Sequence, residues 1–574
     1  MLKDRFANEP HSLTCRVIFQ NMPDRRNPIK PLIVQSDMTL LLETGNDAFE
    51  SARDELAAFA EMVKSPEYVH TYKITPLSLW NAASAGISPE AVIGVLARFS
   101  KYPIAEIVPA RIRQIGERYG KIKIIRDGED LCIHADDEFT MAQMAAEKSV
   151  AQCFLAPPRG NTVSIDPNSR GRVKQALMAI SLPAEDLAGY GEADSLDFGL
   201  NADRGFSPRD YQLASVSAFH AGGKGGHGVI VLPCGAGKTI VGILAMAEFR
   251  TETLILTTSV TAARQWAGEL LDKTSLTADR IGEYSGEKKE IRPVTVSTYQ
   301  ILGAKDSNEE RRHFDLFSRR NWGLIVYDEV HALPAPVFRM TAELQAKRRL
   351  GLTATLVRED GLEGDVFALI GPKRHEVGWK VLEGKGWIAE ADCFEIRVPM
   401  PPDLRMPYAV APRREKFRIA SENPAKLPVV RRLAEKHGGA HILVIGTYLE
   451  QLERIAAALN APLITGKTGN KERMELYGQF RNGAIKTLVA SKVANFAIDL
   501  PDANVAIEVS GGFGSRQEEA QRLGRILRPK QGENRAFFYA LVSAETREEE
   551  FSAHRQLFLV EQGYRYNILD GGME

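Results

Sequence analysis

The sequence has few cysteines, almost no net charge and no long apolar run. Its 574 residues include five cysteines without a C-x-x-C pair, which excludes zinc ribbons and knuckles and indicates a reducing compartment. Lys and Arg number 73 against 74 Asp and Glu, so bulk charge gives no sign of nucleic-acid binding, although local basic patches are not excluded. No apolar stretch approaches the roughly 20 residues that cross a bilayer, and the N-terminus lacks a secretory signal. We expect a cytoplasmic, multidomain protein without membrane contact.

Helix signals dominate residues 31–135, which follow a polar N-terminal arm over 1–30. Apolar residues at helical spacing predict a helix across 49–63. Asp127-Gly128 lies between two alternating runs and predicts a β-hairpin. Helices followed by a hairpin are the order of a winged-helix module, which would bind DNA or, as the alternative, dock a protein. Thr75-Pro76 and Ser88-Pro89 each predict a helix start, because Thr or Ser caps the first turn and Pro fits the first helical position. A further helix is predicted to begin at Val108-Pro109 and to end at Gly120.

Residues 136–203 give weaker signals. A helix is predicted from Gly171 to Ser181, and an acidic stretch from Glu192 to Asp203 is typical of a linker. From about residue 205 onward, short apolar strands alternate with helical patterns, as a parallel α/β sheet requires.

A phosphate-binding loop is predicted in VIVLPCGAGKTIVG, residues 229–242. An apolar strand leads into a glycine-containing loop and then a helix, so backbone N–H groups and the positive helix end face phosphate oxygens. Lys238 would neutralise the β and γ phosphates, and Thr239 would ligate Mg²⁺. The full pattern asks for Gly at position 232, where this chain has Leu232. The predicted loop residues are Pro233, Cys234, Gly235, Ala236, Gly237, Lys238 and Thr239.

An acidic pair follows a second predicted buried strand, 323–327. Asp328 would hold hydrated Mg²⁺, while Glu329 would orient the attacking water and accept its proton. The alternative is a surface acidic pair before a helix. Far downstream, Gln521, Arg525 and Arg528 fall on one face of a predicted helix. An Arg that reaches the γ phosphate from a second lobe would make ATP hydrolysis depend on closure of the two lobes. The predicted catalytic set is Glu329, Asp328, Lys238, Gln521, Arg525 and Arg528.

These segments, in this order, resemble a superfamily-2 helicase, and longer matches resemble the XPB family. GLTATLVRED at 351–360 is similar to its strand-separating segment, and DEVHALPAPVFR at 328–339 is similar to its Walker B region. QEEAQRLGRILRPK at 517–530 resembles its motif VI, and PLIVQSDMTLLLE at 31–43 resembles its N-terminal domain. The likeness therefore covers about residues 30 to 570.

The resemblance implies an α/β fold with two tandem RecA-like parallel-sheet lobes. A smaller winged-helix-like region and an accessory, damage-recognition-like domain would precede these lobes. The implied ranges are 1–30 for the arm, 31–135 for the winged-helix-like domain, 136–203 for the accessory domain and linker, 204–386 for the first lobe and 387–574 for the second lobe, with a thumb near 403–422.

The resemblance also assigns roles to individual residues. Arg209 and Gln212 would contact adenine, and nucleotide state would be coupled to nucleic acid by His331, Thr353, Ala354, Thr355 and Asp499. DNA contacts would come from Arg264, Gln265, Trp266, Ser297 and Thr298, from Arg358, Glu359 and Asp360 at the strand junction, and from the thumb residues Arg413, Arg414, Lys416 and Arg418. A solvated charged helix is the alternative for the thumb. Motif V, 494–499, is less polar than in the family and lacks its Gly.

The implied activity is ATP-dependent 3′–5′ DNA unwinding with ATP and Mg²⁺, on forked or partly single-stranded DNA, in DNA repair. The eukaryotic extensions are missing, which suggests a bacterial or archaeal protein and puts partners from the eukaryotic transcription factor complex in doubt. We expect a monomer that contacts a repair nuclease or another protein through its N-terminal region. The alternatives are a duplex DNA translocase that does not unwind, an interaction protein that acts through its N-terminal domain, and a protein that also uses RNA.

Overall fold

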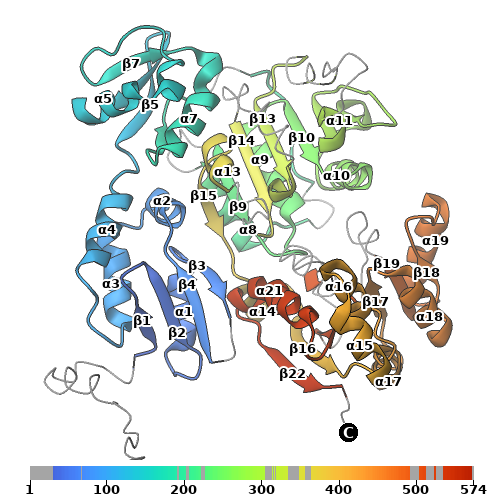
Figure 1. Ribbon diagram of the computed structural model, residues 1–574. Helices are drawn as coiled ribbons and strands as arrows, with labels where there is room; N and C mark the ends of the chain where they lie inside the picture. Colours follow the sequence, from blue (N-terminus) through green and yellow to red (C-terminus); the bar gives the residue numbers. More distant parts are fainter. Residues whose placement is uncertain are drawn as a thin grey trace, which may run out of the picture.

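The computed structural model describes residues 30–65, 68–189, 193–201, 206–220, 226–303, 313, 316, 319–333, 348–355, 363–491, 503–511, 523–524 and 534–571. In this part of the chain, two four-stranded sheets precede two seven-stranded sheets (Figure 1). No helix among the described residues is both long and apolar enough to cross a membrane. The predicted arm, apart from its last residue, lies outside the described residues.

The first sheet is antiparallel, with the order β1-β2-β4-β3, and helices bury its apolar face. The Thr75 and Ser88 side chains accept hydrogen bonds from the backbone of the following turns, so both predicted helix starts are confirmed. The elements are β1 (Leu32–Val34), β2 (Thr39–Glu43), α1 (Phe49–Leu56), β3 (Glu61–Lys64), β4 (Val69–Lys73), α2 (Pro76–Ser84), α3 (Pro89–Phe99) and α4 (Ile107–Gly116).

Two helices end earlier in the chain than the sequence predicts. The helix predicted across 49–63 stops at Leu56, and Val63 lies exposed in β3. Pairing of β3 with β4 determines the conformation there, because a short apolar repeat fits either periodicity and tertiary contacts decide between them. The helix predicted to reach Gly120 ends at Gly116 instead.

The predicted hairpin exists, but it belongs to the second sheet, so a winged-helix arrangement is not confirmed. The hairpin strands β5 (Ile122–Asp127) and β6 (Asp130–Ala135) flank Gly128, whose φ of 61° fits the turn. They pair with β8 and β7 in the order β7-β6-β5-β8, and their apolar side chains are buried there. The predicted boundary after residue 135 therefore falls inside this sheet. Its other elements are α5 (Glu138–Ala146), α6 (Lys148–Ala151), β7 (Thr162–Ile165), η1 (Pro167–Ser169), α7 (Arg170–Ala179) and β8 (Ala184–Asp186).

The acidic stretch predicted as a linker packs against the first lobe where it is described, at 193–201. Leu196 and Phe198 are buried in the core of that lobe, and Leu196 N–H donates to the carbonyl of Arg250 at 2.8 Å. Two apolar side chains hold this segment, although charged residues dominate its composition.

The two seven-stranded sheets have the same topology. Ranked along the chain, the strands of each sheet are ordered third, fourth, second, fifth, sixth, first and seventh, and the paired strands are parallel. This repetition is the two-lobed α/β fold that the sequence predicts. The chain passes from the first sheet to the second between Glu376 and Glu390.

The elements of the first lobe are α8 (Asp210–His220), β9 (His227–Val231), α9 (Lys238–Phe249), β10 (Thr253–Thr257), α10 (Val260–Lys273), η3 (Ala278–Arg280), β11 (Ile281–Tyr284), β12 (Val294–Thr298), α11 (Tyr299–Gly303), β13 (Leu324–Asp328), η5 (Val330–Ala332), β14 (Arg348–Thr353), α13 (Glu363–Leu369), β15 (Lys373–Glu376) and α14 (Trp379–Gly384). The strands β13, β14 and β9 are neighbours in the sheet, so the segments that follow them meet at one edge.

The elements of the second lobe are β16 (Glu390–Val398), α15 (Pro402–Val410), α16 (Arg413–Ser421), α17 (Lys426–Lys436), β17 (Ile442–Gly446), α18 (Leu449–Leu459), β18 (Leu463–Ile464), α19 (Asn470–Arg481), β19 (Thr487–Ser491), β20 (Val505–Glu508), β21 (Arg535–Ser543), α21 (Arg547–Glu561) and β22 (Tyr566–Asp570). The helices α15 and α16 follow the first strand, where the thumb is predicted.

The N-terminal domain, which consists of the first sheet and the helices α1 to α4, contacts both lobes. Leu557 of α21 lies in the apolar core of the N-terminal domain, and α21 (red in Figure 1) runs beside that domain (blue). On the other side, Asn81 Oδ1 accepts a hydrogen bond from Lys373 N–H of β15 at 3.0 Å. The N-terminal domain is therefore a bridge between the two large sheets.

Replacing Leu557 with Ala should lower the free energy of unfolding by about 2–5 kcal/mol, because this side chain is only 3% exposed and its removal leaves a cavity. Chemical denaturation measures the change. Leu449→Ala is a matched control in the same lobe, because Leu449 is 41% exposed and should change stability by under about 0.5 kcal/mol. Equal effects of the two variants would contradict the packing of α21 into the N-terminal domain.

Candidate active site

The phosphate-binding loop leads from β9 into α9 through two glycines in the left-handed region. Gly235 has φ 80° and Gly237 has φ 77°, a conformation that other residues adopt at a cost. A Cβ at Gly237 would lie 2.7 Å from Gln212 Nε2. Gly237, which the motif requires, and Gly235, which it does not, therefore both have a conformational reason in this loop.

Leu232 occupies the position where the full motif has Gly. It is buried, and its N–H donates to the carbonyl of Thr353 at 2.9 Å, which continues the pairing of β9 with β14. This position extends the strand, so a side chain there packs into the core without entering the phosphate loop.

The acidic pair lies beside the loop lysine. Glu329 directly follows β13 and has φ 49°, a left-handed conformation that is strained for a residue with a side chain. Its Oε1 is 3.1 Å from Lys238 Nζ, and its Oε2 is 3.5 Å from His331 Nδ1. The fold therefore brings Lys238 and Glu329, 91 positions apart in the sequence, into one ion pair.

Two aromatic side chains hold the other carboxylate and its backbone. Trp266 Nε1 donates to Asp328 Oδ2 at 2.9 Å, and Tyr299 Oη donates to the Asp328 carbonyl at 2.7 Å. These bonds fix the Asp328 carboxylate at the edge of the sheet.

The electrostatics differ between the members of this cluster. Burial lowers the pKa of Lys238, but the neighbouring Cys234, Glu329 and Asp328 outweigh it, so the pKa lies above its usual value. Burial and the adjacent Glu329 raise the pKa of Asp328. Burial also acts to raise the pKa of Glu329, but Lys238 and His331 lower it by more. A charged Lys238 and an ionised Glu329 are thus mutually stabilised.

The donor set fits a hydrated magnesium ion. The Thr239 hydroxyl is in the first turn of α9, and the Asp328 carboxylate is at the end of β13, so each has oxygen atoms that could serve as Mg²⁺ ligands. No group of three or more His, Cys, Asp or Glu that could hold a metal occurs among the described residues. Mg²⁺ commonly uses one or two protein oxygens together with nucleotide phosphates and water, so Thr239 and Asp328 would suffice.

The predicted coupling residues that are described form a chain of contacts. His331 Nδ1 is 2.7 Å from Thr353 Oγ1, which donates to the carbonyl of Thr355 and accepts from its N–H at 3.2 Å. Ala354 is buried between them. Glu329 is therefore connected through His331 to the end of β14.

The predicted adenine-contacting residues are engaged with the protein. Gln212 is buried, donates to the carbonyl of Ala236 at 3.1 Å and accepts from Arg209 N–H at 2.9 Å. Tyr211 Oη donates to the same carbonyl at 2.6 Å. The Arg209 guanidinium lies 4.3 Å from the ring centroid of Trp387, beyond the first lobe. These residues support the back of the phosphate loop, and adenine contact stays a prediction.

Five predicted DNA contacts of the first lobe divide into two groups. Arg264 and Gln265 are exposed on α10, where Arg264 forms ion pairs with Glu283 and Glu287. Trp266 is only 1% exposed and holds Asp328, which corrects its assignment because it has no surface to offer DNA. The side chains of Ser297 and Thr298 are likewise buried at the end of β12, which excludes direct side-chain contact here.

The predicted thumb consists of α15 and α16. Arg413, Arg414 and Arg418 are exposed, and Arg418 pairs with Glu422 at 2.7 Å. Lys416 Nζ lies 5.6 Å from the ring centroid of Tyr408. A basic, solvent-facing helix is present where the sequence predicts one, and its DNA contact stays a prediction.

The second lobe reaches the phosphate loop. A Cβ added at Gly524 would lie 2.0 Å from Cys234 Cβ, so the backbone of the predicted motif VI is packed directly on the loop. Leu523 beside it is buried in a core that includes residues of both lobes. Other predicted residues lie outside the described residues: Arg358, Glu359, Asp360, Asp499, Gln521, Arg525 and Arg528.

The sequence analysis missed several contacts of the site, including that of Trp266, which it had assigned to DNA. Trp266 and Tyr299 hold Asp328, Tyr211 holds Ala236, and Trp387 packs on Arg209. Their contacts join segments far apart in the chain, and no local spacing indicates them.

Glu329→Gln should lower the rate of ATP hydrolysis by about 10²- to 10⁴-fold, the usual contribution of a general base. Lys238→Ala should abolish it. Phosphate release measures the rate, and circular dichroism should show a retained fold. Lys288→Ala removes an exposed lysine of the same lobe and should hydrolyse ATP normally. Normal turnover by Glu329→Gln would refute the assignment of the base.

Gly524→Ala should slow ATP hydrolysis by about tenfold or more, because the added methyl group displaces the second lobe from Cys234. The control is Gly478→Ala on α19, where an added Cβ meets nothing within 4 Å. Hydrolysis rates of the two variants are compared at saturating ATP. If both match the unmodified protein, this contact between the lobes is unimportant for hydrolysis.

Comparison with known protein families gives three matches along the chain. The ERCC3/RAD25/XPB C-terminal helicase model matches residues 382–573, and the model for the res subunit of type III restriction enzymes matches residues 205–358. The helicase conserved C-terminal domain model matches residues 32–157.

Similar proteins cover almost the whole chain. A "DNA 3'-5' helicase XPB" of Kineococcus radiotolerans is 52% identical over 94% of this chain and 96% of its own length. One of Mycobacterium tuberculosis is 52% identical over 94% and 98%. The "General transcription and DNA repair factor IIH helicase/translocase subunit XPB" of Encephalitozoon cuniculi is 35% identical over 94% and 82%. At this identity and coverage, the chain belongs to the XPB family of helicases.

Proposed function

We propose that this protein is an ATP-dependent 3′–5′ DNA helicase that acts in DNA repair. The Lys238–Glu329 ion pair at the end of β13, beside the phosphate loop, is the observation that carries the ATPase part of the proposal. Polarity, DNA as substrate and repair as the setting rest on the relatives named as DNA helicases of the XPB type.

In the proposed reaction, the γ phosphate of ATP competes with Glu329 for the Lys238 ammonium. Because a buried cation needs an anionic partner, phosphate binding releases the Glu329 carboxylate from Lys238. Glu329 then accepts a proton from the water whose oxygen bonds to the γ phosphorus, while the bond from that phosphorus to the β–γ bridging oxygen breaks and ADP leaves. The pKa of Glu329 lies below its usual value, so the carboxylate is ionised beforehand. Bound Mg²⁺, held by Thr239 and Asp328, would neutralise phosphate charge.

Release of the Glu329 carboxylate would also alter contacts elsewhere in the first lobe. Glu329 Oε2 is near His331, and His331 bonds Thr353 at the end of β14. A change in the charge or position of Glu329 would therefore alter the hydrogen bonds at the end of β14. Gln521, Arg525 and Arg528 are proposed to complete the site from that lobe, because Gly524 in the same segment adjoins Cys234.

For DNA, we propose contacts by Arg264, Gln265 and the basic face of α16, with Arg358, Glu359 and Asp360 at the strand junction and Asp499 in coupling. We also propose that the protein works as a cytoplasmic monomer. A repair nuclease or another protein would bind the N-terminal domain, which already contacts both lobes.

A second candidate is translocation on duplex DNA without unwinding, since one relative is named a helicase/translocase subunit. An Arg358→Ala variant separates the two functions. Loss of strand displacement with retained DNA-stimulated hydrolysis would assign separation to the junction segment, whereas hydrolysis without displacement by the unmodified protein would favour translocation alone.

ATP hydrolysis should be stimulated by single-stranded and forked DNA and less by RNA. Strand displacement should occur on forks with a 3′ tail and fail on those with only a 5′ tail, because loading on the tail sets the direction of travel. Both activities are measured with Lys238→Ala as the inactive control. No stimulation by any DNA would overturn the proposed function.

A further inference from the structure

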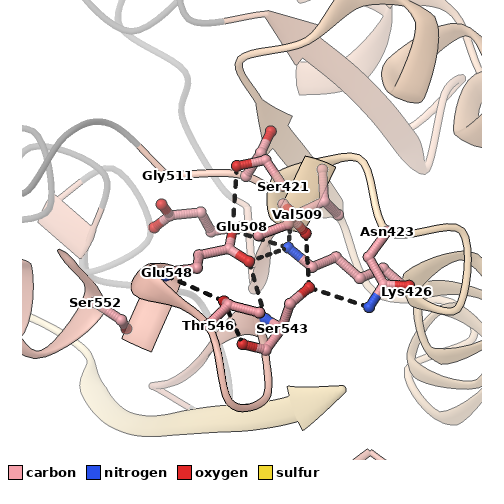
Figure 2. Close-up of polar contacts among 12 residues, drawn as sticks. Ser421, Asn423, Lys426, Glu508, Val509, Gly511, Ser543, Thr546, Glu548 and Ser552 are labelled. Atoms are coloured by element: carbon pink, nitrogen blue, oxygen red, sulfur yellow. Dashed lines mark hydrogen bonds and ion pairs between the residues drawn. The ribbon is translucent and has the colours of Figure 1, made fainter. Parts of the chain in front are cut away.

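A buried ion pair lies in the second lobe, apart from the ATP site. Lys426 begins α17, Glu548 lies in the first turn of α21, and their side chains are 1% and 0% exposed. Lys426 Nζ is 2.9 Å from each carboxylate oxygen and donates to the carbonyl of Val509 at 2.9 Å (Figure 2). One ammonium thus joins α17, α21 and the end of β20.

The same cluster holds the base of the thumb, α15 and α16. Ser543 Oγ donates to the carbonyl of Ala420 in the last turn of α16 at 2.6 Å, and Ser543 N–H donates to Glu548 Oε2 at 2.9 Å. Ser421 Oγ approaches Glu548 Oε1 at 3.5 Å. The C-terminal end of α16 is therefore attached to the ion pair through short polar contacts (Figure 2).

Further contacts attach the thumb to α21. Tyr408 Oη of α15 accepts from Arg547 N–H at 2.8 Å, and the rings of Phe417 and Phe551 pack edge to face with centroids 5.1 Å apart. Both thumb helices therefore contact the first turns of α21, so movement of the thumb must act on that helix.

The segment after β20 is held from the other side of the cluster. Arg555 of α21 pairs with Glu508 at 3.4 Å, and both side chains are buried. A Cβ added at Gly511 would lie 2.2 Å from Arg555 Cζ, so the backbone at this point is packed against α21. Beyond Gly511, the chain reaches Gly524 against Cys234 of the phosphate loop.

We propose that Lys426 and Glu548 are a positioning pair that couples the thumb to the phosphate loop. They fix α16, α21 and the end of β20 relative to one another, so DNA held by the thumb would shift α21 and, with it, Gly511, which packs on Arg555. Gly524, later in the same lobe, would then shift against Cys234. The inference rests on the proposed function, because it takes DNA as the ligand of the thumb.

An ion pair suits this role better than an apolar contact. Replacing a buried pair with apolar side chains of similar volume is often neutral for stability, so stability alone does not require it. Hydrogen bonds are directional, whereas apolar packing is not. Three directed bonds from one ammonium define a relative position that apolar groups would leave free to slide.

The test is the double variant Lys426→Met with Glu548→Gln. It leaves no unpaired buried charge, and the Gln carbonyl can still accept from Ser543 N–H. DNA-free hydrolysis, the KM for ATP and the Kd for DNA should stay within about twofold, while DNA-stimulated kcat should fall by about fivefold or more. The control pair Asp392→Asn with Arg535→Gln lies near the amino-terminal ends of β16 and β21, whereas Lys426 and Glu548 lie near the carboxyl ends of β20 and β21. It should keep full stimulation.

The outcomes are distinguishable. If DNA stimulates the unmodified protein and the double variant equally, the positioning role is overturned. If DNA does not stimulate hydrolysis by the unmodified protein, the proposed function is overturned and the inference that rests on it falls with it. Should the double variant not fold, Ser543→Ala, which removes one hydroxyl bonded to α16, decides: lost stimulation supports the coupling, and full stimulation overturns it.

Discussion

A buried ammonium at the edge of the first parallel sheet must always have an anionic partner, and this constraint organises the candidate site. Desolvation of an unpaired charge costs several kcal/mol, and Lys238 is paired with Glu329. The strained backbone at Glu329 and the bond from Trp266 to Asp328 keep the two adjacent carboxylates in separate roles. In the mechanism that we propose, Lys238 exchanges Glu329 for the γ phosphate, and hydrolysis and its coupling to the second lobe follow from that exchange.

The two large sheets repeat one strand order, yet they contribute differently to the seam between them. The first sheet supplies the phosphate loop after β9 and the acidic pair at the end of β13, two parallel strands that β14 separates. The second supplies a backbone, at Gly524, that fits only because it has no side chain opposite Cys234. Because Gly524 and Cys234 approach so closely, we expect hydrolysis to be sensitive to small displacements of either lobe.

Helix α21 connects parts of the molecule that are distant in sequence. Its first turn bears Glu548 beneath the thumb, Arg555 packs on the segment after β20, and Leu557 lies in the N-terminal core. A partner bound to the N-terminal domain would thus act on a helix that also contacts the thumb. The accessory sheet, which carries the predicted hairpin, is built separately from this connection.

Local rules in the sequence determined the helix caps at Thr75 and Ser88, the hairpin turn at Gly128 and the alternation of strands and helices, because each depends on neighbours within a few residues. The phosphate loop and the acidic pair were also evident, since their chemistry needs fixed short spacings. Only tertiary structure decided that the hairpin joins a second sheet, that Trp266 holds Asp328 and that Lys426 binds Val509 and Glu548. These outcomes depend on which distant surfaces exclude water together, and no local pattern encodes that pairing.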